Sequence, residues 1–137
     1  MIVVLMGGSF DERDAVIRDL MQLYKSRIQC VNVAHLPQPA DRVARLQMEI
    51  NPRRGFRSIT LVNHPTSAEE VAELRRVGAY FAHLYGPLSR VYDHVCVERD
   101  DVQIAPIPHR KSLPSHVLTP EEAMSEFMLR RHKGKVA

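Results

Sequence analysis

The chain opens with an uninterrupted apolar run over residues 1–6, which passes through a glycine-containing segment, residues 7–9, into a helical pattern. An apolar run of strand length without polar alternation is typical of a parallel strand that is buried on both faces. Residues 11–25 then repeat apolar side chains at helical spacing. The buried face of this helix is predicted to hold Val16, Leu20, Leu23 and Tyr24. The start of the chain therefore predicts a strand, a tight turn and an amphipathic helix.

The same alternation of apolar runs and helical patterns continues along the chain. Further strands are predicted at residues 28–33, 58–62, 79–85 and 91–97, and further helices at residues 40–50, 67–77 and from Thr119 onward. Proline, histidine and charged residues predict an irregular loop over residues 100–115. Strands that alternate with helices build a mainly parallel sheet flanked by helices. The predicted fold class is therefore α/β, with three layers.

The composition is that of one globular domain. The chain has 137 residues, of which 45% are hydrophobic and 26% are charged, and its formal net charge is +3. We expect a single α/β domain over residues 1–132 and a flexible basic tail over residues 133–137. The apolar start is too short for a signal peptide or a membrane span, which predicts a cytoplasmic protein that does not insert into a membrane.

The use of cysteine, histidine and aromatic residues narrows the classes of function. Cys30 and Cys96 stand alone in apolar runs, so they are predicted to be small buried residues. The 7 histidines have no metal-ligand spacing, so no metal site is predicted. Because the chain has few aromatic residues and no tryptophan to stack on bases, nucleic acid is not an expected partner.

The segment between the first strand and the first helix is the main candidate for a ligand site. Glycines before a helix N-terminus offer backbone N–H groups and a positive dipole end to an anion. The residues expected to bind a nucleotide or phosphate are Gly7, Gly8, Ser9, Arg13 and Asp14. A plain turn with Ser9 as the helix cap explains the same segment, because Ser9 and Glu12 have capping-box spacing. Both interpretations stay open at this point.

The segment departs from a working P-loop at identifiable positions. A P-loop reads G-x-x-x-x-G-K-[ST], in which the second glycine lets the backbone wrap the phosphates and the lysine reaches their oxygens. Aligned from Gly7, the second glycine falls on Glu12, the lysine on Arg13 and the Ser/Thr on Asp14. A carboxylate beside the phosphates and a guanidinium in place of a compact ammonium both predict impaired phosphate chemistry.

Two segments resemble P-loop deoxynucleoside monophosphate kinases of the phage type. Residues 7–20 are similar to that family's Gly-Lys-Asp loop and first helix, and residues 59–80 resemble a later strand, loop and Glu-containing helix. The resemblance implies a P-loop kinase-like fold with a degenerate Walker A loop. Where the family carries Asp-x-Arg, this chain has Asn63, His64 and Pro65. Asn63 and His64 are therefore accessory site candidates, although a turn explains them as well.

These observations lead to two functional expectations. The first is a degenerate P-loop nucleotide kinase-like protein that binds a Mg-nucleotide without efficient phosphoryl transfer. The alternative is a non-catalytic protein-interaction module of phage or mobile-element type, with residues 105–116 and the basic tail as its partner surfaces. A rival resemblance to adenylyltransferase-type nucleotidyltransferases rests on residues 7–11, but their later Gly-His pair corresponds to Val16 and Ile17 here.

Overall fold

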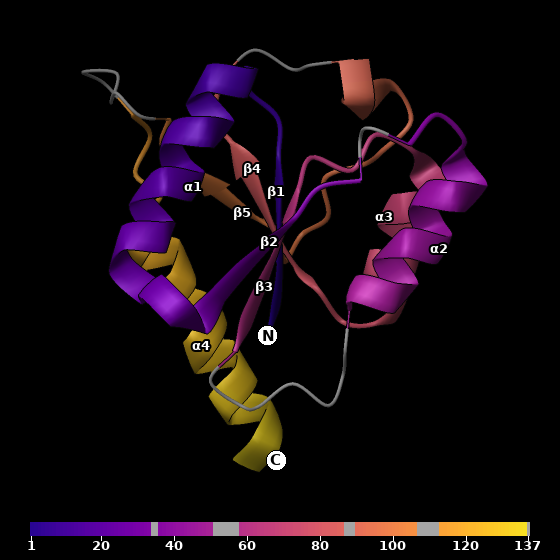
Figure 1. Ribbon diagram of the computed structural model, residues 1–137. Coiled ribbons are helices and arrows are strands. Elements are labelled where there is room, and N and C mark those ends of the chain that lie inside the picture. Colours follow the sequence, from indigo (N-terminus) through magenta and orange to yellow (C-terminus); the bar gives the residue numbers. More distant parts are fainter. Residues whose placement is uncertain (34–35, 51–57, 87–89, 107–112, 137) are drawn as a thin grey trace.

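The computed structural model describes residues 1–33, 36–50, 58–86, 90–106 and 113–136 (Figure 1). The strands are β1 Ile2–Met6, β2 Ile28–Val31, β3 Ile59–Asn63, β4 Tyr80–Leu84 and β5 Val102–Ile104. The α-helices are α1 Phe10–Tyr24, α2 Pro39–Glu49, α3 Ala68–Arg76 and α4 Pro120–Val136. Two short 3-10 helices, η1 Lys25–Arg27 and η2 Arg90–Asp93, complete the described elements.

The strands form one parallel sheet in the order β2-β3-β1-β4-β5. Helices α1 and α4 cover one face, and α2 and α3 cover the other (Figure 1). This arrangement confirms the predicted α/β class with helices flanking a parallel sheet. From β1 the chain continues to β2 at one edge of the sheet, whereas from β4 it continues to β5 at the opposite edge. The connections that follow the neighbouring strands β1 and β4 therefore run in opposite directions. Crevices at the carboxyl ends of such neighbouring strands are the usual ligand sites of open α/β sheets.

The core is divided by the sheet into two layers. Beneath α1 and α4, the buried set includes Leu5, Leu20, Leu61, Met124 and Phe127. Beneath α2 and α3, it includes Met6, Leu46, Val62, Leu74 and Phe81. Neighbouring residues of β1 and β3 alternate between the layers, which explains why both strands are apolar throughout their centres.

Helices α1, α3 and α4 begin at polar residues whose side chains cap their first turns, whereas the N-cap of α2, Gln38, makes no such hydrogen bond. Ser9 and Glu12 form a complete capping box at α1, and the Ser67 hydroxyl accepts a hydrogen bond from the Glu70 N–H at α3. The Thr119 hydroxyl does the same for the Glu122 N–H at α4. These contacts match the predicted helix starts. Among the described residues, no helix is both long and apolar enough to cross a membrane.

The prediction was wrong about the last part of the sheet. Residues 91–97 form no strand, and the 3-10 helix η2 occupies their start. The fifth strand lies instead at residues 102–104, within the predicted irregular loop. Only three residues pair with β4 there, and the alternation of buried Val102 and Ile104 around half-buried Gln103 is too short to stand out in the sequence.

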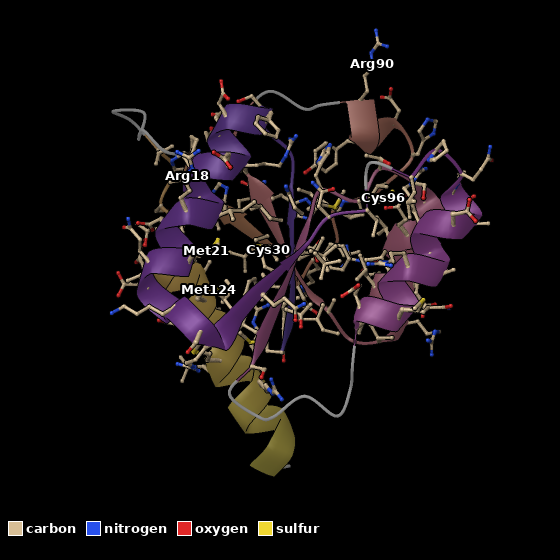
Figure 2. The ribbon with its side chains drawn as sticks, viewed as in Figure 1. Arg18, Met21, Cys30, Arg90, Cys96 and Met124 are labelled. Atoms are coloured by element: carbon tan, nitrogen blue, oxygen red, sulfur yellow. The ribbon has the colours of Figure 1, made fainter. Side chains whose placement is uncertain are left out.

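Two burial predictions were also wrong. Leu23 is 46% exposed, because the buried stripe of α1 runs through Val16, Ile17 and Leu20 and leaves Leu23 at its margin. Cys30 and Cys96 are both exposed free cysteines (Figure 2). Cys30 lies on the edge strand β2, where neighbouring elements cover the side chains incompletely.

Candidate functional site

The loop after β1 contains two glycines that the local geometry requires. Gly7 and Gly8 have φ angles of +83° and +65°, a region that side-chain-bearing residues rarely adopt. A Cβ at Gly7 would lie 2.8 Å from the Tyr92 hydroxyl oxygen, and a Cβ at Gly8 would lie 2.8 Å from Leu84 Cδ1. The space that the glycines leave beside the backbone is therefore filled by the protein's own side chains.

Glu12 satisfies the backbone at the N-terminus of α1. Its carboxylate Oε1 accepts a hydrogen bond from the Ser9 N–H at 3.0 Å, and its own N–H donates to the Ser9 hydroxyl at 3.2 Å. A backbone N–H that a bound anion would use is thus already paired with a carboxylate. Glu12 acts here as an internal anion.

Arg13 folds back onto the glycine loop. Its Nη1 donates to the carbonyl oxygens of Gly7 and Gly8, at 2.9 Å in each case. Burial lowers the pKa of Arg13, while the neighbouring Tyr92 and Glu12 oppose that shift. The guanidinium remains cationic, as arginine does throughout proteins. The loop therefore has a fixed positive charge next to its two glycine carbonyls.

Asp14 lies away from this loop. Its carboxylate pairs with Arg18 Nε at 3.0 Å, one turn further along α1. Together with Asp11, Asp19 and other α1 residues, it lines an open groove along the helix. Of the predicted phosphate-binding residues, the structure thus brings Gly7, Gly8, Ser9 and Arg13 together and directs Asp14 elsewhere.

Asn63 and His64, at the end of β3, lie at the same edge of the sheet. The His64 N–H donates to the Leu5 carbonyl at 2.8 Å, which ties this turn to β1. His64 has a φ of +49°, and the side-chain atoms Asn63 Oδ1 and His64 Nδ1 are buried without a hydrogen-bond partner among the described residues. Burial, together with the charge of Arg13, lowers the pKa of His64 to about 4, against an opposing effect of Glu70. The imidazole is therefore neutral at neutral pH.

A buried ion pair that the sequence did not reveal, Arg42–Glu70, is close enough to His64 to affect its pKa. Glu70 is 1% exposed, and its Oε1 accepts hydrogen bonds from Arg42 Nε at 2.6 Å and from the Ser67 hydroxyl at 2.9 Å. Arg42 Nη1 also donates to the Leu36 carbonyl at 2.8 Å. The Glu70 carboxylate therefore connects α2 to α3 instead of closing a full capping box at Ser67.

A second buried chain of polar contacts reaches the loop from β4. The Tyr92 hydroxyl lies 2.7 Å from His83 Nδ1, and His83 Nε2 lies 2.8 Å from Asp101 Oδ2. Arg75 donates to both Asp101 oxygens, at 2.6 and 2.7 Å. Because the carboxylate can only accept, a neutral His83 donates from Nε2 and accepts the Tyr92 O–H at Nδ1. The sequence offered no signal for this chain, since its members are separated widely in sequence and meet only across elements.

These contacts fix the charge states of Asp101 and Tyr92. Burial alone would raise the pKa of Asp101, but hydrogen bonds from Arg75, His83 and the Glu98 N–H hold it well below its usual range. Burial, together with the Asp101 charge, raises the pKa of Tyr92 to about 12, against the effect of Arg13. Asp101 is therefore a carboxylate and Tyr92 a neutral phenol over the ordinary range of pH.

The residues at this edge do not fit a Mg²⁺ ion. Magnesium prefers carboxylate oxygens and water in an octahedral arrangement. The Glu12 carboxylate is engaged at Ser9, Asp14 faces outward with Arg18, and the Arg13 guanidinium lies against the loop. The described residues contain no group of three or more histidine, cysteine, aspartate or glutamate side chains that could hold a metal ion.

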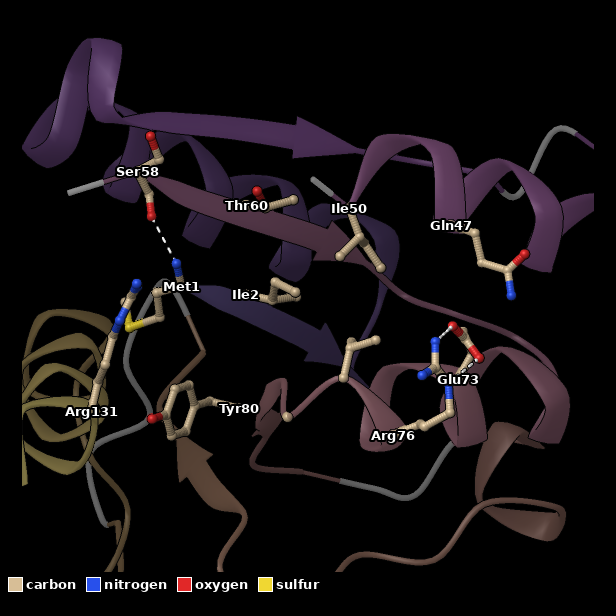
Figure 3. A pocket seen from close by; sticks show the side chains of 12 residues that line it. Met1, Ile2, Gln47, Ile50, Ser58, Thr60, Glu73, Arg76, Tyr80 and Arg131 are labelled. Carbon is tan, nitrogen blue, oxygen red and sulfur yellow. Dashed lines mark hydrogen bonds and ion pairs between the residues drawn. The ribbon is translucent and has the colours of Figure 1, made fainter. Parts of the chain in front are cut away.

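A separate cavity opens at the opposite, amino end of the sheet (Figure 3). It has a volume of 530 Å³ and is lined by both apolar and polar side chains, including Ile2, Thr60 and Tyr80. The Arg76 guanidinium on its wall is paired with Glu73, at 2.6 Å. Residues 51–57, which join two of the lining residues, lie outside the described part of the chain.

Comparison with known proteins identifies no relative. No family model, no curated protein and no solved structure matches this chain. Function is therefore inferred from the residues and their geometry.

Proposed function

We propose that this chain is a P-loop kinase-like protein that binds the phosphate groups of a nucleotide at the Gly7–Gly8 loop without efficient phosphoryl transfer. The observation that carries the proposal is the Arg13 guanidinium, held within 2.9 Å of both glycine carbonyls at the N-terminus of α1. The loop also follows the central strand β1, at the change of direction next to β4. A helix N-terminus, glycines and a fixed cation together favour a phosphate.

The proposed absence of transfer rests on the carboxylates near the loop. Phosphoryl transfer requires Mg²⁺ and several cations that neutralise the charge on the transferred group. Glu12 contributes a negative charge at the Ser9 N–H, and Asp14 is engaged with Arg18 on the outer side of α1. The turn after β3 supplies a neutral His64 and an amide, Asn63, in place of charged groups. These features support binding and oppose catalysis.

Titration of the chain with ATP, with and without Mg²⁺, tests the proposal by calorimetry. We expect Arg13→Ala to weaken binding by at least about tenfold, the effect of one charge-assisted hydrogen bond. Arg18→Ala is the matched control, because Arg18 lies on the same helix with its side chain 78% exposed and pairs with Asp14. Absence of binding at millimolar ATP, or equal effects of the two substitutions, would contradict the proposal.

Glu12→Gln is expected to strengthen ATP binding, a result that a loss of folding cannot produce. Glutamine keeps an oxygen for the Ser9 N–H but removes the negative charge beside the phosphates. We expect ATP to bind about fivefold more tightly, since two like charges a few ångströms apart in a solvated site repel by about 1 kcal/mol. A coupled assay for ADP formation with deoxynucleoside monophosphates should show no turnover in the wild-type chain; turnover at kinase rates would refute the non-catalytic part of the proposal.

The alternative function, a protein-interaction module, is favoured by a different observation. Tyr92, Leu84 and Glu12 already fill the space beside Gly7 and Gly8. A loop that is permanently filled would serve only as a turn in a scaffold. If ATP binds neither to the wild-type chain nor to the Glu12→Gln variant, this second function is the one that the geometry supports.

A further inference from the structure

Tyr92 lies against Gly7, at the carboxyl ends of β1 and β4. Its hydroxyl oxygen would lie 2.8 Å from a Cβ at Gly7, and its ring carbon Cε2 would lie 3.5 Å from the same position. Glycines in phosphate-binding loops allow a phosphate to approach the backbone closely. At Gly7, the group that makes this close approach is the Tyr92 side chain.

The position of Tyr92 is set by a series of contacts that runs through β4, the segment before β5, and α3. Its hydroxyl is held by His83 on β4, which is 3% exposed and which contacts Asp101 just before β5. Asp101 in turn accepts hydrogen bonds from both terminal guanidinium nitrogens, Nη1 and Nη2, of Arg75 on α3. The His83 and Tyr92 rings also pack against each other, with centroids 5.5 Å apart. This chain orients the Tyr92 hydroxyl toward the loop rather than toward solvent.

The element that carries Tyr92 is a single short turn at the surface. The 3-10 helix η2 spans residues 90–93. Arg90 at its start is exposed (Figure 2), and so is Asp93 at its end. The first buried residue after it is Val95, which packs into the core beneath α2 and α3. Tyr92 itself is partly buried and packs at the margin of the same core, so a movement of η2 would remove Tyr92 both from this core and from the loop.

We propose that Tyr92 is an autoinhibitory plug of the Gly7–Gly8 loop, latched by the His83–Asp101–Arg75 chain, and that a nucleotide phosphate binds only when η2 carries Tyr92 away. This inference rests on the proposed function, because the plug regulates the same loop. The ligand competes with an internal side chain, so the apparent affinity is reduced by the fraction of molecules in which the loop is open. Weakening the latch raises that fraction and hence the affinity.

Tyr92→Phe tests the plug, with ATP as the probe and the full chain as the protein. The substitution keeps the ring but removes the hydroxyl that His83 holds. We expect ATP to bind about fivefold more tightly, the effect of losing one hydrogen bond from the closed state. Tyr85→Phe is the matched control. Tyr85 lies directly after β4, the strand that carries His83, and its ring faces His116 instead of the loop. This control should leave the affinity unchanged.

Hydrogen–deuterium exchange supplies the second measurement. At saturating ATP, the amides of residues 90–94 of the wild-type chain should exchange faster than without ATP, because η2 has moved. If wild-type chain and Tyr92→Phe bind ATP equally, or if binding leaves the exchange of η2 unchanged, the plug is refuted while the proposed function stands. If neither protein binds millimolar ATP, removing the latch uncovers no site, and both proposals fail.

Discussion

The two faces of the sheet differ in the polarity of the side chains that are buried against them. Beneath α1 and α4, the packed side chains are apolar and belong to one continuous cluster. On the α2 and α3 side, the core also contains buried polar groups, namely Thr60, Glu70 and His83. Thr60 and His83 point to that side because their strand neighbours, such as Leu61 and Leu84, point to the other.

The difference indicates which face serves stability alone. Buried charges are costly to desolvate, and apolar side chains of similar volume stabilise a fold at least as well. Two of these polar groups make specific contacts: His83 connects Tyr92, beside the loop after β1, to Asp101, and Glu70 connects Arg42 to Ser67 at the start of α3. We infer that the α2 and α3 side positions polar groups at the carboxyl edge of the sheet, while the α1 and α4 side contributes apolar packing only.

Asp101→Ala should give the largest loss of stability. A small loss would contradict the view that the polar contacts on the α2 and α3 side form a connected network. The substitution leaves Arg75 and His83 without their shared carboxylate, which costs about 3–5 kcal/mol of unfolding free energy. Because the pKa of Asp101 in the folded chain lies below its ordinary value of 3.8, its stabilising effect is present above that pH and declines as the pH falls below it. Urea denaturation at several pH values measures both effects. The exposed Asp93 is the control, and a loss below about 1 kcal/mol in Asp101→Ala would show that the chain is not a stabilising network.

Leu20→Ala sharpens the comparison from the apolar face. Leu20 is on α1 and its side chain is buried against the sheet. Its truncation should lower the free energy of unfolding by about 3 kcal/mol, because burial is lost and a cavity remains. The pH dependence of stability between pH 3 and 7 should remain that of the wild-type chain, because the buried residues of this cluster carry no ionisable side chain. Leu23→Ala on the same helix is the control and should change stability by less than about 0.5 kcal/mol. A changed pH dependence in Leu20→Ala would mean that the two faces are coupled.

His64→Asn should give the smallest effect, visible only in acid. The pKa of His64 falls from 6.5 to about 4 on folding, so below pH 6.5 the unfolded chain gains a proton that the folded chain does not. Wild-type stability should therefore decline between pH 6.5 and 4, by about 1–2 kcal/mol after allowance for solvent screening of a half-buried group. Asparagine abolishes this decline and also tolerates the positive φ of the site. The matched substitution His94→Asn, at an exposed histidine, should leave the decline intact.

Local sequence signals predicted the elements that they specify directly. The apolar runs of β1, β3 and β4 and the caps Ser9, Ser67 and Thr119 each determine their own segment, and the structure has these elements within a few residues of their predicted bounds. The strand β5 was missed because three residues carry too little periodicity to be recognised. Its pairing with β4 is a tertiary contact.

The candidate site was predicted only in the part that is contiguous in the chain. Gly7, Gly8, Ser9 and Arg13 lie together because they fall within seven consecutive residues, the turn after β1 and the first turn of α1. Glu70 and Arg42 are 28 positions apart, and Asp101 and Arg75 are 26 positions apart. No local pattern marks such pairs, so neither ion pair could be predicted.

The sequence by itself determined a parallel α/β sheet and a tight glycine loop in front of a capped helix, because these depend on residue periodicity and on short-range hydrogen bonds. Only the tertiary structure decided what fills that loop. The strand order makes β1 and β4 neighbours, which brings Leu84 and, through His83, Tyr92 against Gly7 and Gly8. Burial then fixes the charge of each group there, since the same side chain ionises differently once neighbouring elements exclude water from it.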